Sequence, residues 1–121
     1  ETLALPKQGC VELPRLGLRV VCSVAEQILD TPEDFTVTPR GEMVLRSRRS
    51  GDDLTRSGGT KSLKKRFIDR KIPARQRDLI PVVADEHGIL GVYGFGADKN
   101  RMGCGVRIRF EKKENKREVI L

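Results

Sequence analysis

Apolar residues alternate with polar ones near both ends of this chain and recur at helical spacing in its middle. Residues 105–111 place apolar side chains on one face and charged side chains on the other, which is typical of a half-buried strand. Residues 61–72 instead carry apolar side chains four positions apart, as one face of a helix does. Strands, then helices, then strands predict an α+β fold, with mixed or antiparallel strands and two short helices in the middle.

Prolines set the limits of the two helices. Pro73 disfavours the helical conformation of the residue before it, so the first helix is expected over 61–72, capped by Thr60 or Ser62. Pro73 also suits the first turn of a second helix, expected over 74–80. Leu63 and Phe67 lie on one face of the first helix. We expect both to be core residues rather than ligand contacts.

Short apolar runs bounded by turn residues predict the strands. Residues 28–35 contain a Thr-Pro-Glu-Asp turn and are expected to link two strand regions. His87 lies in the turn of the second expected hairpin and is interpreted as a turn residue. Strand structure is expected at 9–26 (a hairpin), 35–38, 43–47, 81–93 (a hairpin), 105–111 and 118–121. Residues 1–40 are expected to precede a main region, 41–121, within the same domain.

Positive charge is concentrated in one third of the chain. The net charge is +7, from 24 Lys and Arg against 17 Asp and Glu. Between Arg40 and Asp78 there are 13 basic and 5 acidic residues, a local balance of +8, so the remainder sums to −1. This uneven distribution favours a polyanion-binding face over an ordinary solvated surface. The candidate RNA-binding residues are Arg46, Arg48, Arg49, Lys61, Lys64, Lys65, Arg66, Arg70, Lys71 and Arg77.

The sequence offers no catalytic constellation and no metal site. Cys10, Cys22 and Cys104 are odd in number, widely separated and far from the single His87, which argues against zinc. We expect free, mostly buried thiols in a reducing compartment. No apolar run approaches the ~20 residues of a membrane span, and no signal-peptide pattern opens the chain, so a soluble cytoplasmic protein is expected.

One stretch imitates a phosphate-binding loop. Ser57-Gly-Gly-Thr-Lys-Ser62 looks like the Ser-Gly-Gly-x-Asp-Ser loop with which pyrophosphate-forming ATP enzymes bind phosphate. Lys61 stands where that loop has Asp, and a polar run rather than a buried strand precedes it. We therefore expect a flexible connector here and no cofactor site in this chain.

A longer motif carries a family likeness. Arg46-x-Arg48-Arg49-x-Gly51-Asp52, followed by Gly59-x-Lys61-x-Leu63-Lys64-x-x-Phe67-Ile68-Asp69-x-Lys71-Ile72-Pro73, resembles the carboxy-terminal domain of tRNA(Ile)-lysidine synthetase. The likeness covers about residues 41–101. This chain has Ser50 where the family often has Pro, and Gly91 where it often has Trp, which removes a packing ring.

The resemblance implies that this domain has a fold similar to that of a domain of phenylalanyl-tRNA synthetase and that it grips the tRNA acceptor stem. The full enzyme would use ATP and magnesium to adenylate a cytidine in the anticodon of a minor isoleucine tRNA, and then join lysine to it. Its catalytic domain is amino-terminal and not in this chain, so this piece is expected to be inactive alone, with tRNA and that domain as partners. The alternatives are a structural domain packing on its parent enzyme, or another basic nucleic-acid-binding or ribosome-associated module.

Overall fold

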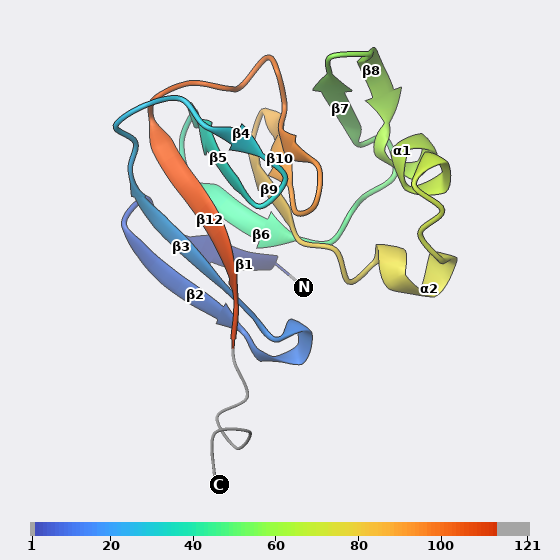
Figure 1. Cartoon of the computed structure of the whole chain (residues 1–121), viewed down its shortest axis with the longest axis horizontal. Helices are drawn as coiled ribbons and strands as arrows, with labels where there is room; N and C mark the ends of the chain where they lie inside the picture. The colour runs from blue at the N-terminus through green and yellow to red at the C-terminus, as the bar shows by residue number, and fades with distance from the viewer. Residues whose placement is uncertain (1, 114–121) are drawn as a thin grey trace, which may run out of the picture.

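The computed structural model describes residues 2–113, which form two five-stranded sheets, a separate hairpin and two short helices (Figure 1). Every strand pairing among these residues is antiparallel. The predicted α+β architecture, with two helices in the middle of the chain, is confirmed. The strand expected at 118–121 lies outside the described residues.

The first sheet has the order β1 (Thr2–Leu5), β6 (Met43–Arg46), β9 (Val82–Asp85), β10 (Gly88–Val92) and β11 (Gly96–Ala97). The second has the order β2 (Gly9–Leu13), β3 (Leu18–Val24), β12 (Val106–Lys112), β5 (Asp34–Val37) and β4 (Asp30–Thr31). A 3-10 turn, Pro14–Leu16, joins β2 to β3. The predicted hairpins at 9–26 and 81–93 are both present.

The main core lies between the two sheets. Strand β12 contributes Val106, Ile108 and Phe110, which are buried as the alternation predicts, while the residues between them are less enclosed. The first sheet contributes Leu5 of β1 and Val83 of β9. Because β1 pairs with β6 along its length, the first forty residues share this core with the rest of the chain. The boundary at residue 40 stays a prediction.

Strand β9 is buried on both faces, because a second layer covers the outer face of the first sheet. Val82 and Ala84 of this strand pack with Leu63 and Phe67 of helix α1, while Val83 faces the main core. Leu63 and Phe67 are 1% and 0% exposed, so their predicted core role is confirmed. Burial on both sides explains why this strand is a continuous apolar run rather than an alternating one.

The outer layer consists of the hairpin β7 (Asp53–Arg56) and β8 (Gly59–Ser62), helix α1 (Leu63–Asp69) and helix α2 (Ala74–Arg77), seen at the right of Figure 1. The expectation of a flexible connector was wrong. Residues 53–62 pair as a hairpin with Thr55 opposite Thr60, and the buried Leu54 fixes it to α1. A strand therefore does lead into the Ser57–Ser62 stretch.

Helix α1 is shorter than predicted. Ser62 caps it, accepting a hydrogen bond from the Lys65 amide at 3.1 Å, as one of the two expected caps. It ends at Asp69 because Lys71 adopts φ = 58°, a left-handed conformation. The Lys71 amide then donates to Ile68 (2.9 Å) and the Ile72 amide donates to Phe67 (3.0 Å), the Schellman pattern. Helix α2 starts after Pro73 as expected but covers one turn only.

The cysteines are free, but only Cys22 is buried, so the expectation of mostly buried thiols was wrong for Cys10 and Cys104. Burial raises the pKa of the Cys22 thiol to about 11, helped by the nearby Cys10. Across residues 2–113 no helix is long and apolar enough to cross a membrane. The same residues contain no cluster of three His, Cys, Asp or Glu side chains that could hold a metal ion.

Candidate nucleic-acid interface

The ten candidate cations come from one side of the molecule. They lie at the end of β6, in the loop 47–52 that follows it, along β8 and α1, and in the turn and helix α2 beyond. Apart from the end of β6, which belongs to the first sheet, these segments lie in or beside the outer layer that covers this sheet (Figure 1). The fold therefore gathers the basic segment on a single layer, which we call the cationic layer.

Arg46 is buried rather than exposed to solvent. It is 9% exposed, and its two terminal nitrogens donate to the two carboxylate oxygens of Asp52 at 2.9 and 3.1 Å. Its Nη1 also donates to the Ser47 carbonyl at 3.0 Å. This bidentate geometry uses the guanidinium fork to hold a carboxylate. That Arg46 contacts RNA stays a prediction, and its guanidinium is occupied by Asp52 and the Ser47 carbonyl.

Asp52 connects the loop 47–52 to helix α1. Its Oδ2 accepts the Arg49 amide at 2.7 Å, and its own amide donates to the Arg49 carbonyl at 3.1 Å. Its carbonyl accepts the Leu63 amide at 2.8 Å. In the sequence, Asp52 stood out only as a member of the family motif. The six-residue spacing between Arg46 and Asp52 within the family motif was the signal that could have indicated their pairing.

Four cations surround a depression of about 430 Å³ beside this loop. Arg48 and Arg49 belong to the loop, Lys64 to α1, and Arg77 to α2. The Nε of Arg48 donates to Asp78 Oδ1 at 3.0 Å, and the Nε of Arg77 donates to the Ile72 carbonyl at 2.8 Å. The remaining lining residues are Ser50, Gly51, Asp52, Ser62 and Leu63.

Two further arginines of the cationic layer hold its parts together. Arg66 donates to the carbonyls of Leu54 (2.9 Å) and Gly59 (2.8 Å), and so fixes the β7–β8 hairpin to α1. Arg70 donates to the Gly94 carbonyl at 3.0 Å, and its guanidinium lies 4.2 Å from the centre of the Phe95 ring. These contacts occupy part of each guanidinium, although Arg70 remains exposed to solvent.

The lysines are the more accessible cations. Lys61 and Lys65 both reach Asp69, at 3.4 and 3.5 Å, and these exposed pairs contribute little to stability. Lys64 and Lys71 are exposed on α1 and in the turn after it. Within the predicted set, Arg46 and Arg66 are therefore held by internal contacts, whereas Arg49 and the lysines are exposed.

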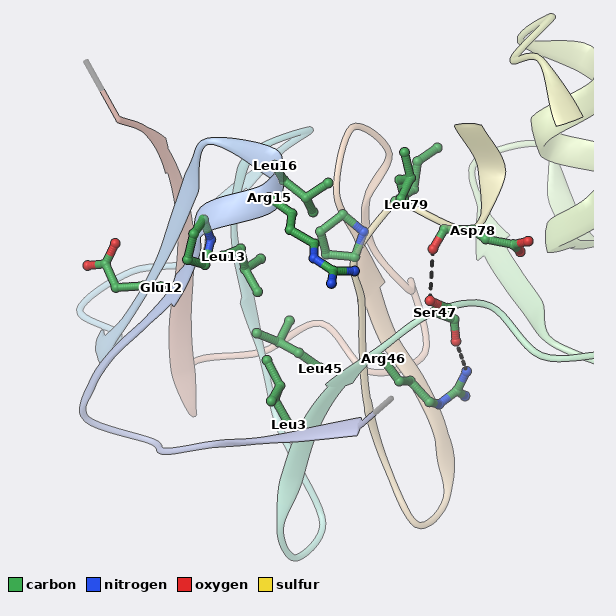
Figure 2. A pocket seen from close by; sticks show the side chains of 13 residues that line it. Leu3, Glu12, Leu13, Arg15, Leu16, Leu45, Arg46, Ser47, Asp78 and Leu79 are labelled. Atoms are coloured by element: carbon green, nitrogen blue, oxygen red, sulfur yellow. Dashed lines mark hydrogen bonds between the residues drawn. The ribbon is translucent and has the colours of Figure 1, made fainter. Parts of the chain in front are cut away.

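A larger depression of about 660 Å³ has a different chemistry (Figure 2). Leucines from β1, β2 and β6 point into it, and Leu79, which is 55% exposed, lies at its rim. Ser47 Oγ donates to the Asp78 carbonyl at 2.8 Å on its other side. Its mainly apolar lining does not suit a phosphate backbone, so the cationic depression is the better candidate for a polyanion.

The phosphate-loop lookalike does not fit a nucleotide. Ser57 and Gly58 form the tip of the β7–β8 hairpin, and all four residues of β8 are exposed. A Cβ added to Gly58 or Gly59 would meet no atom within 4 Å, so no wall surrounds these backbone amides as a cradle would. We assign no ATP-binding role to this stretch.

The fold and site together define a small antiparallel β-sandwich domain that displays a cationic helical layer on one outer face. A family model described as the TilS substrate C-terminal domain matches residues 43–119. This chain belongs to that family, the one that the sequence resembles. A crystal structure of a TilS C-terminal domain superposes with a TM-score of 0.77 at 27% identity, covering 95% of this chain and 98% of the other.

Its relatives are tRNA(Ile)-lysidine synthases. The protein from Clostridioides difficile is 36% identical over 81 residues, 67% of this chain and 16% of that protein. The protein from Oceanobacillus iheyensis is 36% identical over 98 residues, 73% of this chain and 20% of the relative. The chain thus spans no more than a fifth of the length of these two relatives.

Proposed function

We propose that this chain is the tRNA-binding domain of a tRNA(Ile)-lysidine synthetase and grips the acceptor stem of its tRNA. In this role it supports the ATP-dependent attachment of lysine to the anticodon cytidine, which another domain catalyses. The observation that carries the proposal is the cationic layer, in which a basic segment is folded onto one outer face of a domain of this family.

The placement of the aromatic side chains supports duplex rather than single-stranded RNA as the ligand. All four Phe residues are buried, and Tyr93 packs against Phe110 with ring centres 5.0 Å apart. Recognition of single strands commonly stacks bases on exposed aromatic rings. An RNA duplex is instead recognised through phosphates, 2′-hydroxyls and shape, for which exposed Lys and Arg suffice.

The test is a titration of fluorescent isoleucine tRNA with this chain at several salt concentrations. We expect binding that weakens as salt rises, with an acceptor-stem hairpin competing better than the anticodon stem-loop of the same tRNA. A triple variant, Lys61→Gln, Lys64→Gln and Lys65→Gln, should bind more weakly with a shallower salt slope. The matched control removes the same charge elsewhere, with Lys7→Gln, Arg15→Gln and Lys112→Gln, all exposed residues outside the layer.

Equal losses in the triple variant and its control would show that only net charge matters and would overturn the assignment of the layer. Absence of tRNA binding at low salt would favour the alternative, a domain that packs on its parent enzyme. Binding in which both competitors are equally effective would support a general RNA-binding module and contradict the acceptor-stem assignment.

A further inference from the structure

The cationic depression brings together side chains from three separate segments. Arg48 and Arg49 come from the loop after β6, Lys64 from the first turn of α1, and Arg77 from α2. The other residues that line it are mostly small, and Gly51 adopts φ = 90° in the turn of the loop. Cations that converge from several segments on a hollow can surround one anionic group, whereas cations spread over a flat face meet separate groups.

The acidic residue in this depression does not cancel its positive charge. Asp52 is paired with Arg46, which lies outside the depression, and its Oδ2 also accepts the Arg49 amide. Asp78 pairs with Arg48 from a position that is 70% exposed and does not line the depression. A surplus of positive charge therefore faces the hollow.

We propose that this depression binds a single backbone phosphate of duplex tRNA, with Arg49 and Lys64 on opposite segments holding the same phosphate and Arg48 and Arg77 completing the positive wall. The inference rests on the proposed function and adds to it one defined contact point. Guanidinium forks match the oxygens of a phosphate, and an ammonium adds a point charge from another direction. The remaining lysines of the layer then contact other phosphates.

Asp52 acts in this proposal as a positioning residue. Its hydrogen bonds to Arg46, to the Arg49 amide and to the Leu63 amide set the loop against α1, so that loop and helix cations face one hollow. Simple electrostatics predicts that Asp52→Asn, which removes a negative charge beside the phosphate, should strengthen RNA binding. The proposal predicts the opposite, because the loop loses the carboxylate that orients Arg49.

The deciding experiment is a pair of double-mutant cycles on tRNA binding, each measured across salt concentrations. The test cycle combines Arg49→Gln with Lys64→Gln, and the control cycle combines Arg49→Gln with Lys65→Gln, the next residue on α1, which does not line the depression. If Arg49 and Lys64 share one phosphate, their double variant lowers the salt slope by no more than the ~0.7 to 0.9 expected for one contact. The control double variant lowers it by about twice as much.

Affinity should follow the same pattern, with strongly non-additive losses in the test cycle and additive losses in the control cycle. Asp52→Asn should bind tRNA more weakly than the unmodified chain while retaining a cooperative thermal transition. Additive losses in both cycles, with tRNA binding intact, would overturn the shared phosphate and leave the proposed function standing. Stronger binding by a folded Asp52→Asn variant would also contradict the proposal, and failure of the unmodified chain to bind tRNA would instead refute the proposed function.

Discussion

At the scale of single residues, Asp85 shows how a carboxylate is held inside this fold. Its side chain is fully enclosed and accepts the amides of Arg40 and His87, each at 2.8 Å. It also pairs with the guanidinium of Arg101. Burial alone would raise the pKa of Asp85, but the hydrogen bonds from Arg101 and the two amides outweigh it and hold the pKa below its ordinary value.

This lowered pKa predicts a stability that depends on pH. Because the folded pKa lies below the unfolded value of about 3.9, Asp85 contributes stability above that pH, and the contribution is lost as the pH falls through the folded pKa. Asp85→Asn should destabilise the domain by about 3 to 5 kcal/mol at neutral pH, since Arg101 loses a buried partner. Urea denaturation of both proteins at neutral and acidic pH checks this. If the difference between their free energies of unfolding does not become smaller in acid, the prediction is wrong.

Gly91 is required because an aromatic ring occupies the space beside it. A Cβ added there would lie 2.4 Å from Cε1 of Phe35. This ring belongs to Phe35 of β5, which lies on the facing sheet. Gly91→Ala should therefore cost about 1 to 3 kcal/mol through overpacking.

Thermal denaturation compares Gly91→Ala with Gly58→Ala, whose added Cβ would meet nothing within 4 Å. The smaller side chain of Phe35→Leu should recover part of the loss when it is combined with Gly91→Ala, although it costs stability alone. Equal melting temperatures for the two glycine variants would show that Phe35 can move aside at no cost in stability, and would contradict the overpacking prediction.

At the scale of elements, the end of helix α1 places a lysine where glycine is favoured. Lys71 takes the left-handed position of the Schellman turn, at φ = 58°. Lys71→Gly should stabilise the domain by about 0.5 to 1 kcal/mol, because relief of this strain exceeds the entropy that glycine adds to the unfolded chain. The control, Lys65→Gly inside the same helix, should destabilise it by about 1 kcal/mol. A loss of stability in both variants, measured by chemical denaturation, would refute the strain argument.

The elements that the sequence predicted are those whose apolar residues alternate or recur clearly. Strand β12 alternates strictly, whereas the β9–β10 hairpin consists of two continuous apolar runs on either side of a polar turn, and both were found. The β7–β8 hairpin was missed because β8 is wholly exposed and Leu54 is the buried residue of β7, so neither strand carries alternation. The predicted helix was longer than α1 because Pro73 indicates only that the helix ends before residue 73. The left-handed conformation of Lys71 ends it earlier, at Asp69.

The candidate site was predictable as a segment but not as a set of free side chains. Charge counting located the cationic layer, because its residues are contiguous in sequence. It could not show that Arg46 is paired with Asp52 or that Arg66 binds the Leu54 carbonyl, since both depend on tertiary contacts. Nor could it show that residues from three segments meet at one depression.

At the scale of the whole molecule, the fold predicts that this chain alone makes no lysidine. The stretch that imitates a phosphate loop is an exposed hairpin. Incubation with ATP, magnesium, lysine and isoleucine tRNA should release no pyrophosphate and incorporate no lysine above background. The tRNA(Ile)-lysidine synthase of Clostridioides difficile serves as the positive control in the same assay. Turnover that is abolished by changing Lys61 would overturn the prediction.

The central place of β12 in the second sheet decides when this domain can fold during synthesis. Val106–Lys112 pairs with β3 on one side and β5 on the other, so partners from the beginning of the chain meet a strand from its far end. Pairing strands that are distant in sequence closes long loops, and the entropy lost in closing them must be spent before the new contacts stabilise the chain. Folding is therefore slow. A nascent chain still holding Val106–Lys112 in the ribosomal exit tunnel has β3 and β5 without their shared neighbour. The apolar faces of β3 and β5 stay exposed to solvent until Val106–Lys112 emerges.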